Sequence, residues 1–183
     1  PFFDQSGGGV TFSGGEPLLY PEFLVRLLDA CGRKNIHRAI DTSGHVKAET
    51  LLEVAEHTDL FLYDLKLIDA QRHKDYTGVD NQLILNNLRL LAESGAVIQV
   101  RIPLIGGVND DLESVKAFAG FIAGLAGESK AVNLLPFHDV ARGKDMKLGQ
   151  ERDLSSLREP GEESVARALG IFREHGLTAG IGG

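Results

Sequence analysis

Polar and glycine residues recur in this chain directly after short apolar stretches, at five separate places. The five groups are Gly14-Gly15-Glu16, Asp41-Thr42, Asp64 with Lys66, Arg101, and His138. Each group by itself has an ordinary explanation as a turn, a cap or a surface ion pair, and surface ion pairs contribute little to stability. Their repetition after successive apolar stretches indicates instead that the five groups meet in a single ligand site.

The acidic residues of this set favour a cation or a cationic ligand between them. Asp41 and Asp64 would repel each other if they ended neighbouring strands with nothing positive in between. Thr42 adds a hydroxyl and a backbone carbonyl, and such oxygen ligands suit a hard cation. Glu16 places a third carboxylate beside the two glycines.

The remaining groups favour a small zwitterion as the ligand. Lys66 and Arg101 offer positive charge for a carboxylate or for ribose oxygens. Gly14 and Gly15 allow positive φ and let a ligand come close to bare backbone N–H and C=O groups. These residues therefore predict an amino-acid-like ligand rather than a phosphate.

The elements that must position these residues alternate along the chain. Apolar and β-branched runs predict strands at residues 10–13, 37–41, 60–63, 97–102, 131–135 and 177–181. Apolar residues at helical spacing predict helices at residues 21–34, around 51–55, and at 81–94, 110–126 and 162–175, and residues 69–78 are expected to form a short helix and loop. The alternation predicts an α/β fold with a parallel sheet and excludes an antiparallel sandwich. A doubly wound sheet and a (β/α) barrel both stay open, and in either the carboxyl ends of the strands share one face.

Composition limits the class of protein further. The chain of 183 residues suits one domain, residues 1–183, and its net charge of -7 argues against a nucleic-acid surface. It has no apolar run of 18 residues and no signal peptide, so we expect a cytoplasmic protein that does not bind membranes. The single cysteine, Cys31, excludes a disulfide framework within the chain. The chain begins at Pro1 without a Met, so we expect it to be a piece of a longer protein.

The stretch from Gly7 to Leu18, Gly-Gly-Gly-Val-Thr-Phe-Ser-Gly-Gly-Glu-Pro-Leu, closely resembles the corresponding stretch of glycyl-radical-enzyme activating enzymes. These are radical S-adenosylmethionine proteins, and pyruvate formate-lyase activating enzyme is the best-known member. The resemblance continues with order and spacing kept at residues 41–44, 63–66, 100–103, 107–110 and 134–138. It spans nearly the whole chain and is highly specific to the family.

The resemblance implies a fold and a cofactor. The family folds as a partial (β/α)6 barrel of parallel strands, of which the first strand would be missing here. Gly14, Gly15 and Glu16 match the motif that holds the methionine amino group of S-adenosylmethionine, chiefly through the backbone. Lys66 and Arg101 match polar contacts to the same cofactor.

The resemblance also implies a metal site and an adenosine contact. Asp41, Thr42 and Asp64 match positions that bind a monovalent cation beside the carboxylate of the cofactor. His138 matches a contact near the adenosine part.

By resemblance, the activity is radical chemistry on a protein. The family reductively cleaves S-adenosylmethionine, and the 5′-deoxyadenosyl radical removes a hydrogen from a backbone glycine of a partner enzyme under anaerobic conditions. The partner would be a glycyl radical enzyme, with pyruvate formate-lyase as the default, and the electron donor flavodoxin or ferredoxin. Dehydratase, decarboxylase and amine-lyase activators share these motifs. We expect the choice of partner to lie in loops such as 69–79 and 139–161.

One family feature has no counterpart in the sequence. The family holds a [4Fe–4S] cluster on three cysteines spaced C-x3-C-x2-C, whereas Cys31 lies on a predicted helix in a segment with no cluster role. We expect that the cluster segment is lost by truncation before Pro1, a natural cluster-free relative being the alternative, and that this chain alone is inactive. A sheet that lacks its first strand has an exposed edge, so self-association is also expected. A clean monomer at high concentration in size-exclusion chromatography would contradict it.

Two other functions fit the same residues. The first is a Schiff-base lyase on a (β/α) barrel, with Lys66 as the nucleophile and Asp64 assisting. Trapping of a carbonyl substrate on Lys66 by borohydride would support it. The second is a non-catalytic module that binds a peptide or protein, with an affinity that S-adenosylmethionine does not change.

Overall fold

The structure, a computed structural model, describes residues 8–127, 130–138 and 157–182. These residues form a single sheet of parallel strands in the order β1-β2-β3-β4-β5-β6. The strands are β1 (Gly9–Phe12), β2 (His37–Thr42), β3 (Leu60–Asp64), β4 (Ile98–Leu104), β5 (Ala131–Pro136) and β6 (Thr178–Ile181). The sequential order excludes a doubly wound sheet, in which the strand order reverses, and confirms the expectation of a partial (β/α) barrel.

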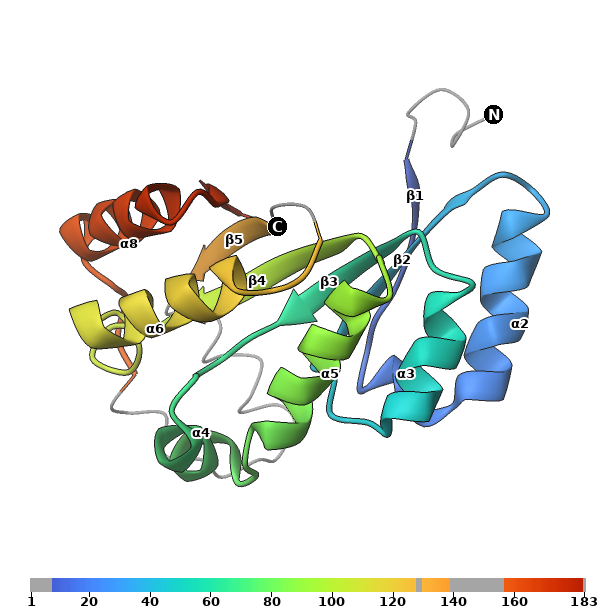
Figure 1. The fold of residues 1–183 in the computed structure, drawn as a ribbon, viewed down its shortest axis with the longest axis horizontal. Helices are drawn as coiled ribbons and strands as arrows, with labels where there is room; N and C mark the ends of the chain where they lie inside the picture. Colours follow the sequence, from blue (N-terminus) through green and yellow to red (C-terminus); the bar gives the residue numbers. More distant parts are fainter. Residues whose placement is uncertain (1–7, 128–129, 139–156, 183) are drawn as a thin grey trace.

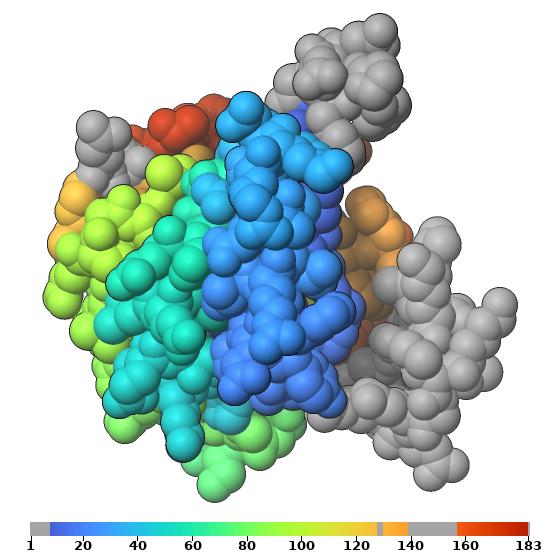
Figure 2. Space-filling view, turned by 90° about the vertical axis from the view of Figure 1, so that its right-hand side faces the viewer, coloured from blue at the N-terminus to red at the C-terminus, as the bar shows by residue number. Residues whose placement is uncertain are grey.

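The helices connect successive strands and cover one face of the sheet (Figure 1). They are η1 (Pro17–Leu19), α2 (Pro21–Gly32), α3 (Ala48–Ala55), α4 (Ala70–Thr77), α5 (Gln82–Glu93), α6 (Leu112–Ala123) and α8 (Glu162–Glu174). Figure 2 shows this layer from the side, with α2 in front and α3 packed next to it. The opposite face of the sheet has no helix on it in the described part of the chain (Figure 1).

The strand residues divide between a helix-covered face and an open face. Phe61 and Tyr63 of β3 are fully buried in the core beneath the helices, while Leu62 and Asp64 alternate with them and are only half-buried. Successive side chains on a strand point to opposite faces, so the half-buried residues lie on the open face. The same alternation places Arg101 of β4 there, level with Asp64 in the register of the two strands.

The expected end of the fourth strand at Ile102 is wrong, because β4 continues through Pro103 to Leu104. Proline in a central strand usually removes a ladder hydrogen bond. Here β3 pairs with β4 only as far as Arg101, whose carbonyl accepts from the N–H of Leu65. Two residues further on, the nitrogen of Pro103 faces the same side of the strand, where β3 has ended, so no bond is lost.

The structure also shows how two helices begin. The short helix η1 was not expected; its proline opens the turn and Glu16 caps it by accepting from the N–H of Leu18 at 3.3 Å. In the helix expected at residues 110–126, α6 begins after Asp111, which caps it by accepting from the N–H of Ser114 at 2.9 Å. Residues 1–7 lie outside the described residues, and so do residues 139–156, which make up most of the loop 139–161 expected to determine the partner.

The described helices include no segment with both the length and the apolarity that a bilayer crossing needs.

Candidate functional site

Arg101 lies between Asp41 and Asp64 and links the ends of three neighbouring strands. Its Nε and Nη2 atoms donate to Oδ1 of Asp64 at 2.9 and 2.8 Å, and Nη2 also donates to Oδ1 of Asp41. Ser13, just after β1, donates from its hydroxyl to Oδ2 of Asp41 at 3.1 Å. The structure thus brings the two expected aspartates together, and the positive group between them is the guanidinium of Arg101.

These three side chains are shielded from water but not sealed from it. The exposed fraction is 15% for Arg101, 23% for Asp41 and 24% for Asp64. Burial raises the pKa of the Asp64 carboxyl, and the positive charge of Arg101 opposes that rise without cancelling it. In the described part of the chain, Nη1 of Arg101 makes no hydrogen bond, so one arm of the guanidinium is available to a ligand.

The carboxylate of Glu16 ties the loop after β1 to the end of β2. Its Oε1 accepts from the hydroxyl of Thr42 at 2.7 Å, and its Oε2 accepts from the N–H and the hydroxyl of Ser43 at 3.0 and 2.7 Å. Oε1 also accepts from the N–H of Leu18 at 3.3 Å. These bonds engage the carboxylate of Glu16 within the protein and anchor the loop that contains the Gly14-Gly15 turn.

That turn, Gly14-Gly15, is exposed and unobstructed. Gly14 has φ +126°, a conformation that other residues rarely adopt, and a Cβ placed on either glycine would meet no atom within 4 Å. The turn follows β1, whose neighbour β2 ends at the Asp41 carboxylate. Its backbone groups are therefore open to a ligand that sits over the carboxyl ends of the strands.

The remaining expected residues line the same end of the sheet. Lys66 is exposed two residues after the end of β3, and its backbone carbonyl accepts from the side chain of Asn109 at 3.0 Å. His138 is exposed after β5, with its Nδ1 3.6 Å from a carboxylate oxygen of Glu159. In the described residues, no hydrogen bond joins the side chain of Lys66 or of His138 to Asp41, Asp64 or Arg101.

The residues expected to hold a monovalent cation are only partly arranged for it. Thr42 is 2% exposed, and its hydroxyl donates to Glu16 and accepts from the N–H of Gly44 at 2.9 Å. The hydroxyl thus lies on the helix-covered side, whereas the carboxylate of Asp41, the preceding residue, lies on the open side. Within the residues that the structure describes, no group of three or more acidic, histidine or cysteine side chains could hold a metal ion.

Sequence reasoning missed the two serines of this site. Ser13 hydrogen bonds to Asp41, and Ser43 supplies two of the donors to Glu16. Each serine is adjacent in sequence to an expected site residue, which was the available signal. Hydroxyls next to glycines and acids are so common in turns that this signal alone does not distinguish them.

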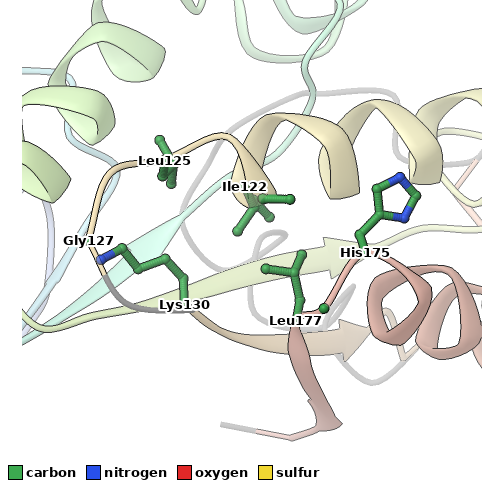
Figure 3. Close-up of a pocket in the computed structure, with 8 residues that line it drawn as sticks. Ile122, Leu125, Gly127, Lys130, His175 and Leu177 are labelled. Carbon is green, nitrogen blue, oxygen red and sulfur yellow. The ribbon is translucent and has the colours of Figure 1, made fainter.

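A cavity of about 170 Å³ lies away from these residues, at the amino ends of β5 and β6 (Figure 3). Its lining includes Ile122, Leu125, Lys130 and Leu177, and His175 lies at its edge with Nδ1 bonded to the carbonyl of Ile171 at 2.8 Å. Figure 3 shows the Lys130 amine extending toward Gly127, away from His175. The cavity contains none of the expected site residues.

The residues of this chain suit a zwitterionic ligand, but they do not suit an iron–sulfur cluster. Cys31, the single cysteine of the sequence, is a free thiol on α2, in the helical layer that covers the other face of the sheet. The residues present do not provide the three-cysteine ligand set. They do provide an open glycine turn, an exposed lysine and a partly free guanidinium, which suit a ligand that carries both an amine and a carboxylate.

Comparison with known proteins gives a consistent result. The profile of the Radical SAM superfamily matches residues 3–119. Over its whole length the chain is 42% identical to trans-4-hydroxy-L-proline dehydratase activating enzyme from Clostridioides difficile, of which it covers 61%. It is 33% identical to pyruvate formate-lyase 1-activating enzyme from Escherichia coli, with 96% of this chain and 72% of the relative covered.

A solved structure shares the fold as well. A domain of pyruvate-formate lyase-activating enzyme from Bacteroides vulgatus matches with a TM-score of 0.83 and 42% identity, covering 97% of this chain and 100% of that one. The chain spans about three fifths of the length of the first of these curated relatives.

Proposed function

The chain belongs to the radical SAM superfamily, among its glycyl-radical-enzyme activating enzymes, and on this premise we propose that it is the S-adenosylmethionine-binding part of an enzyme that generates a glycyl radical on a partner such as pyruvate formate-lyase. The observation that carries the proposal is the cluster of Asp41, Asp64 and Arg101 at the carboxyl ends of the strands, beside the open Gly14-Gly15 turn.

The residues present would hold the two ends of the methionine part of the cofactor. Backbone groups of Gly14 and Gly15 would bind the amino group, and Lys66 with the free arm of Arg101 would bind the carboxylate. His138 would contact the adenosine part. When bound, S-adenosylmethionine supplies the 5′-deoxyadenosyl group that takes a hydrogen atom from the substrate glycine.

A monovalent cation beside the cofactor would have Asp41 and Asp64 as its carboxylate ligands. From Thr42 it would take the backbone carbonyl, since the hydroxyl is held by Glu16. The cation would also share these carboxylates with Arg101, so we expect it to bind together with the cofactor rather than before it.

In this proposal, the chain binds the cofactor and the partner. Its 183 residues contain one cysteine, so the ligands of a [4Fe–4S] cluster are not among them. By resemblance to the family, we infer that flavodoxin or ferredoxin supplies the electron. A cytoplasmic location stays a prediction from the sequence. Residues 1–183 would form one radical SAM domain.

The partner would be a glycyl radical enzyme. Pyruvate formate-lyase, a dehydratase, a decarboxylase and an amine-lyase are the candidate classes. Residues 69–79 are one of the loops expected to determine the partner, but most of them form helix α4; this segment still supports a protein partner because two of its apolar side chains are exposed. Tyr76 is 45% exposed and Val79 41% exposed, next to the loop that carries Lys66. In the described residues, no observation favours the Schiff-base lyase or the peptide-binding module over this proposal.

The proposal is tested by joining this chain to a three-cysteine segment of the family type and assaying it anaerobically with S-adenosylmethionine and a reductant. Pyruvate formate-lyase and trans-4-hydroxy-L-proline dehydratase serve as partners. We expect a glycyl radical, seen by electron paramagnetic resonance, on one of them and a large loss of signal with Lys66→Ala. Cofactor cleavage without a radical on either partner would contradict the proposed partner class.

A further inference from the structure

Residues 65–69, which we call the β3 exit segment, carry Lys66 from the end of β3 to the start of α4. The segment is not part of a strand or a helix, and the N–H of Leu65 donates to the carbonyl of Arg101 at 2.9 Å. Leu65 and Leu67 are 1% and 3% exposed, so the neighbouring carbonyls lie close to the core. Buried carbonyls without partners are costly, which means that the segment needs donors from elsewhere.

Two buried asparagines supply those donors to three consecutive carbonyls. The Nδ2 atom of Asn109 donates to the carbonyl of Lys66 at 3.0 Å, and that of Asn81 donates to the carbonyls of Leu67 and Ile68 at 2.9 and 2.8 Å. Both asparagines are 1% exposed. A side-chain amide suits this position because it has two N–H donors and carries no charge to desolvate.

Asn109 also joins the segment to the neighbouring strand. Its Nδ2 atom donates to the carbonyl of Pro103 at 2.8 Å, while its Oδ1 atom accepts from the N–H of Ile105 at 2.8 Å. The amide thus bridges the ends of β3 and β4, which carry Asp64 and Arg101. Lys66 is exposed, so the fixed backbone beneath it is what determines where its amine can reach.

We propose that Asn109 and Asn81 are positioning residues that hold Lys66 in place for the carboxylate of the ligand. The inference rests on the proposed function, in which Lys66 contacts S-adenosylmethionine. It adds that affinity for this ligand depends on two buried amides that do not touch the ligand themselves. Their effect passes through Lys66 and disappears when the lysine is absent.

The chain offers a matched control in Asn87. This residue is fully buried, and its Nδ2 atom likewise donates to two loop carbonyls, those of Gly44 and Val46, at 2.8 and 2.7 Å. Those carbonyls belong to the loop after β2 rather than to the β3 exit segment. Replacing Asn87 therefore removes a chemically similar clamp from a different loop.

The test combines a binding cycle with hydrogen exchange on the full chain. Lys66→Ala should weaken binding of S-adenosylmethionine by about tenfold, the effect of losing one charge-assisted hydrogen bond. Asn109→Ala should weaken it by about three- to tenfold, and the double variant should bind about as weakly as Lys66→Ala alone. Asn87→Ala should instead combine additively with Lys66→Ala.

Amide hydrogen exchange provides a readout that needs no ligand. Asn109→Ala should accelerate exchange of the Leu65 N–H while leaving that of Val46 unchanged, and Asn87→Ala should do the reverse. If Asn109→Ala fails to fold, Asn81→Ala takes its place in both measurements.

The outcomes separate the inference from the function on which it rests. Additive losses in the Asn109 and Lys66 cycle, or unchanged exchange at Leu65, would overturn the positioning role. An unmodified chain without affinity for S-adenosylmethionine, or a Lys66→Ala variant with full affinity, would instead overturn the proposed ligand contact while the exchange result stands.

Discussion

At the scale of single residues, Arg101 supplies the positive charge that allows the carboxylates of Asp41 and Asp64 to lie close together at the end of the sheet. It donates to both Asp41 and Asp64, and all three side chains are less than a quarter exposed. A partly buried charge that loses its partner keeps its desolvation cost without compensation. Arg101 therefore has a structural role in the free protein, and under the proposed function it would also bind the ligand.

Arg101→Gln should destabilise the chain by about 1–3 kcal/mol, because it leaves two facing carboxylates without their cation. Combining it with Asp64→Asn should recover part of the loss, since only one carboxylate then needs a partner. Urea unfolding at neutral pH measures both variants. Equal stability of Arg101→Gln and the unmodified chain would show that the cluster contributes nothing to folding.

Alanine should affect stability at one of two glycines near the site and ligand binding at the other. Gly44 has φ +70°, and a Cβ placed on it would lie 1.7 Å from the hydroxyl of buried Tyr63, so Gly44→Ala should cost about 3 kcal/mol or more. Gly15→Ala meets no atom within 4 Å and should leave stability within about 0.5 kcal/mol while weakening binding of S-adenosylmethionine.

Thermal unfolding and calorimetry of these two variants separate folding from binding. A Gly15→Ala protein with unchanged affinity would contradict a ligand over the glycine turn. A Gly44→Ala protein with unchanged stability would contradict the close packing of Tyr63 against the loop after β2.

At the scale of elements, the amino ends of the strands are fixed by a different ion pair from the one at the site. Asp59, just before β3, accepts from the N–H and Nε of Arg38 at 2.8 Å and from Nη2 at 2.7 Å. These bonds from Arg38 outweigh burial and lower the pKa of Asp59 to about 2. The pair holds the start of β3 against β2, at the end of the sheet remote from Arg101.

The pair predicts a defined loss of stability in acid. The pKa of Asp59 is lowered on folding, so its contribution is present above the ordinary aspartate value of 3.8 and is lost as the pH falls from there toward about 2. Asp59→Asn should therefore flatten the dependence of unfolding free energy on pH in that window. Parallel curves for the two proteins between pH 4 and about 2 would contradict the assignment.

The sequence predicted the elements better than the contacts between them. Continuous apolar runs such as residues 60–63 and strand-end acids such as Asp64 are local signals, and they led to the parallel sheet and to the expectation that Asp41, Asp64 and Arg101 lie together at its edge. The role of Glu16 could not be predicted, because its partners Thr42 and Ser43 are 26 and 27 residues away in sequence. The hydrogen bonds from the buried asparagines could not be predicted either. An asparagine in a sequence usually indicates a turn or a helix cap, and the partner of Asn109 at Lys66 is 43 residues away.

At the scale of the whole molecule, the helices cover one face of the sheet and leave the other to the site (Figure 1). The strands run parallel in sequential order, so every strand end contributes to one rim. In the described residues β1 pairs with β2 alone, and the expected self-association through such an edge stays a prediction. The open face and its rim are where the cofactor and a partner glycine would have to meet.

Binding of S-adenosylmethionine to this chain, measured by isothermal titration calorimetry, tests the central claim most directly. We predict weak binding that strengthens with added potassium and that Asp64→Ala abolishes, because this carboxylate orients Arg101 and would hold the cation. Gly15→Ala should weaken the same binding, and Cys31→Ser, on the far side of the sheet, should not change it. Binding that ignores both Asp64→Ala and potassium, or no binding at all, would contradict the assignment of the cofactor site to these strand ends.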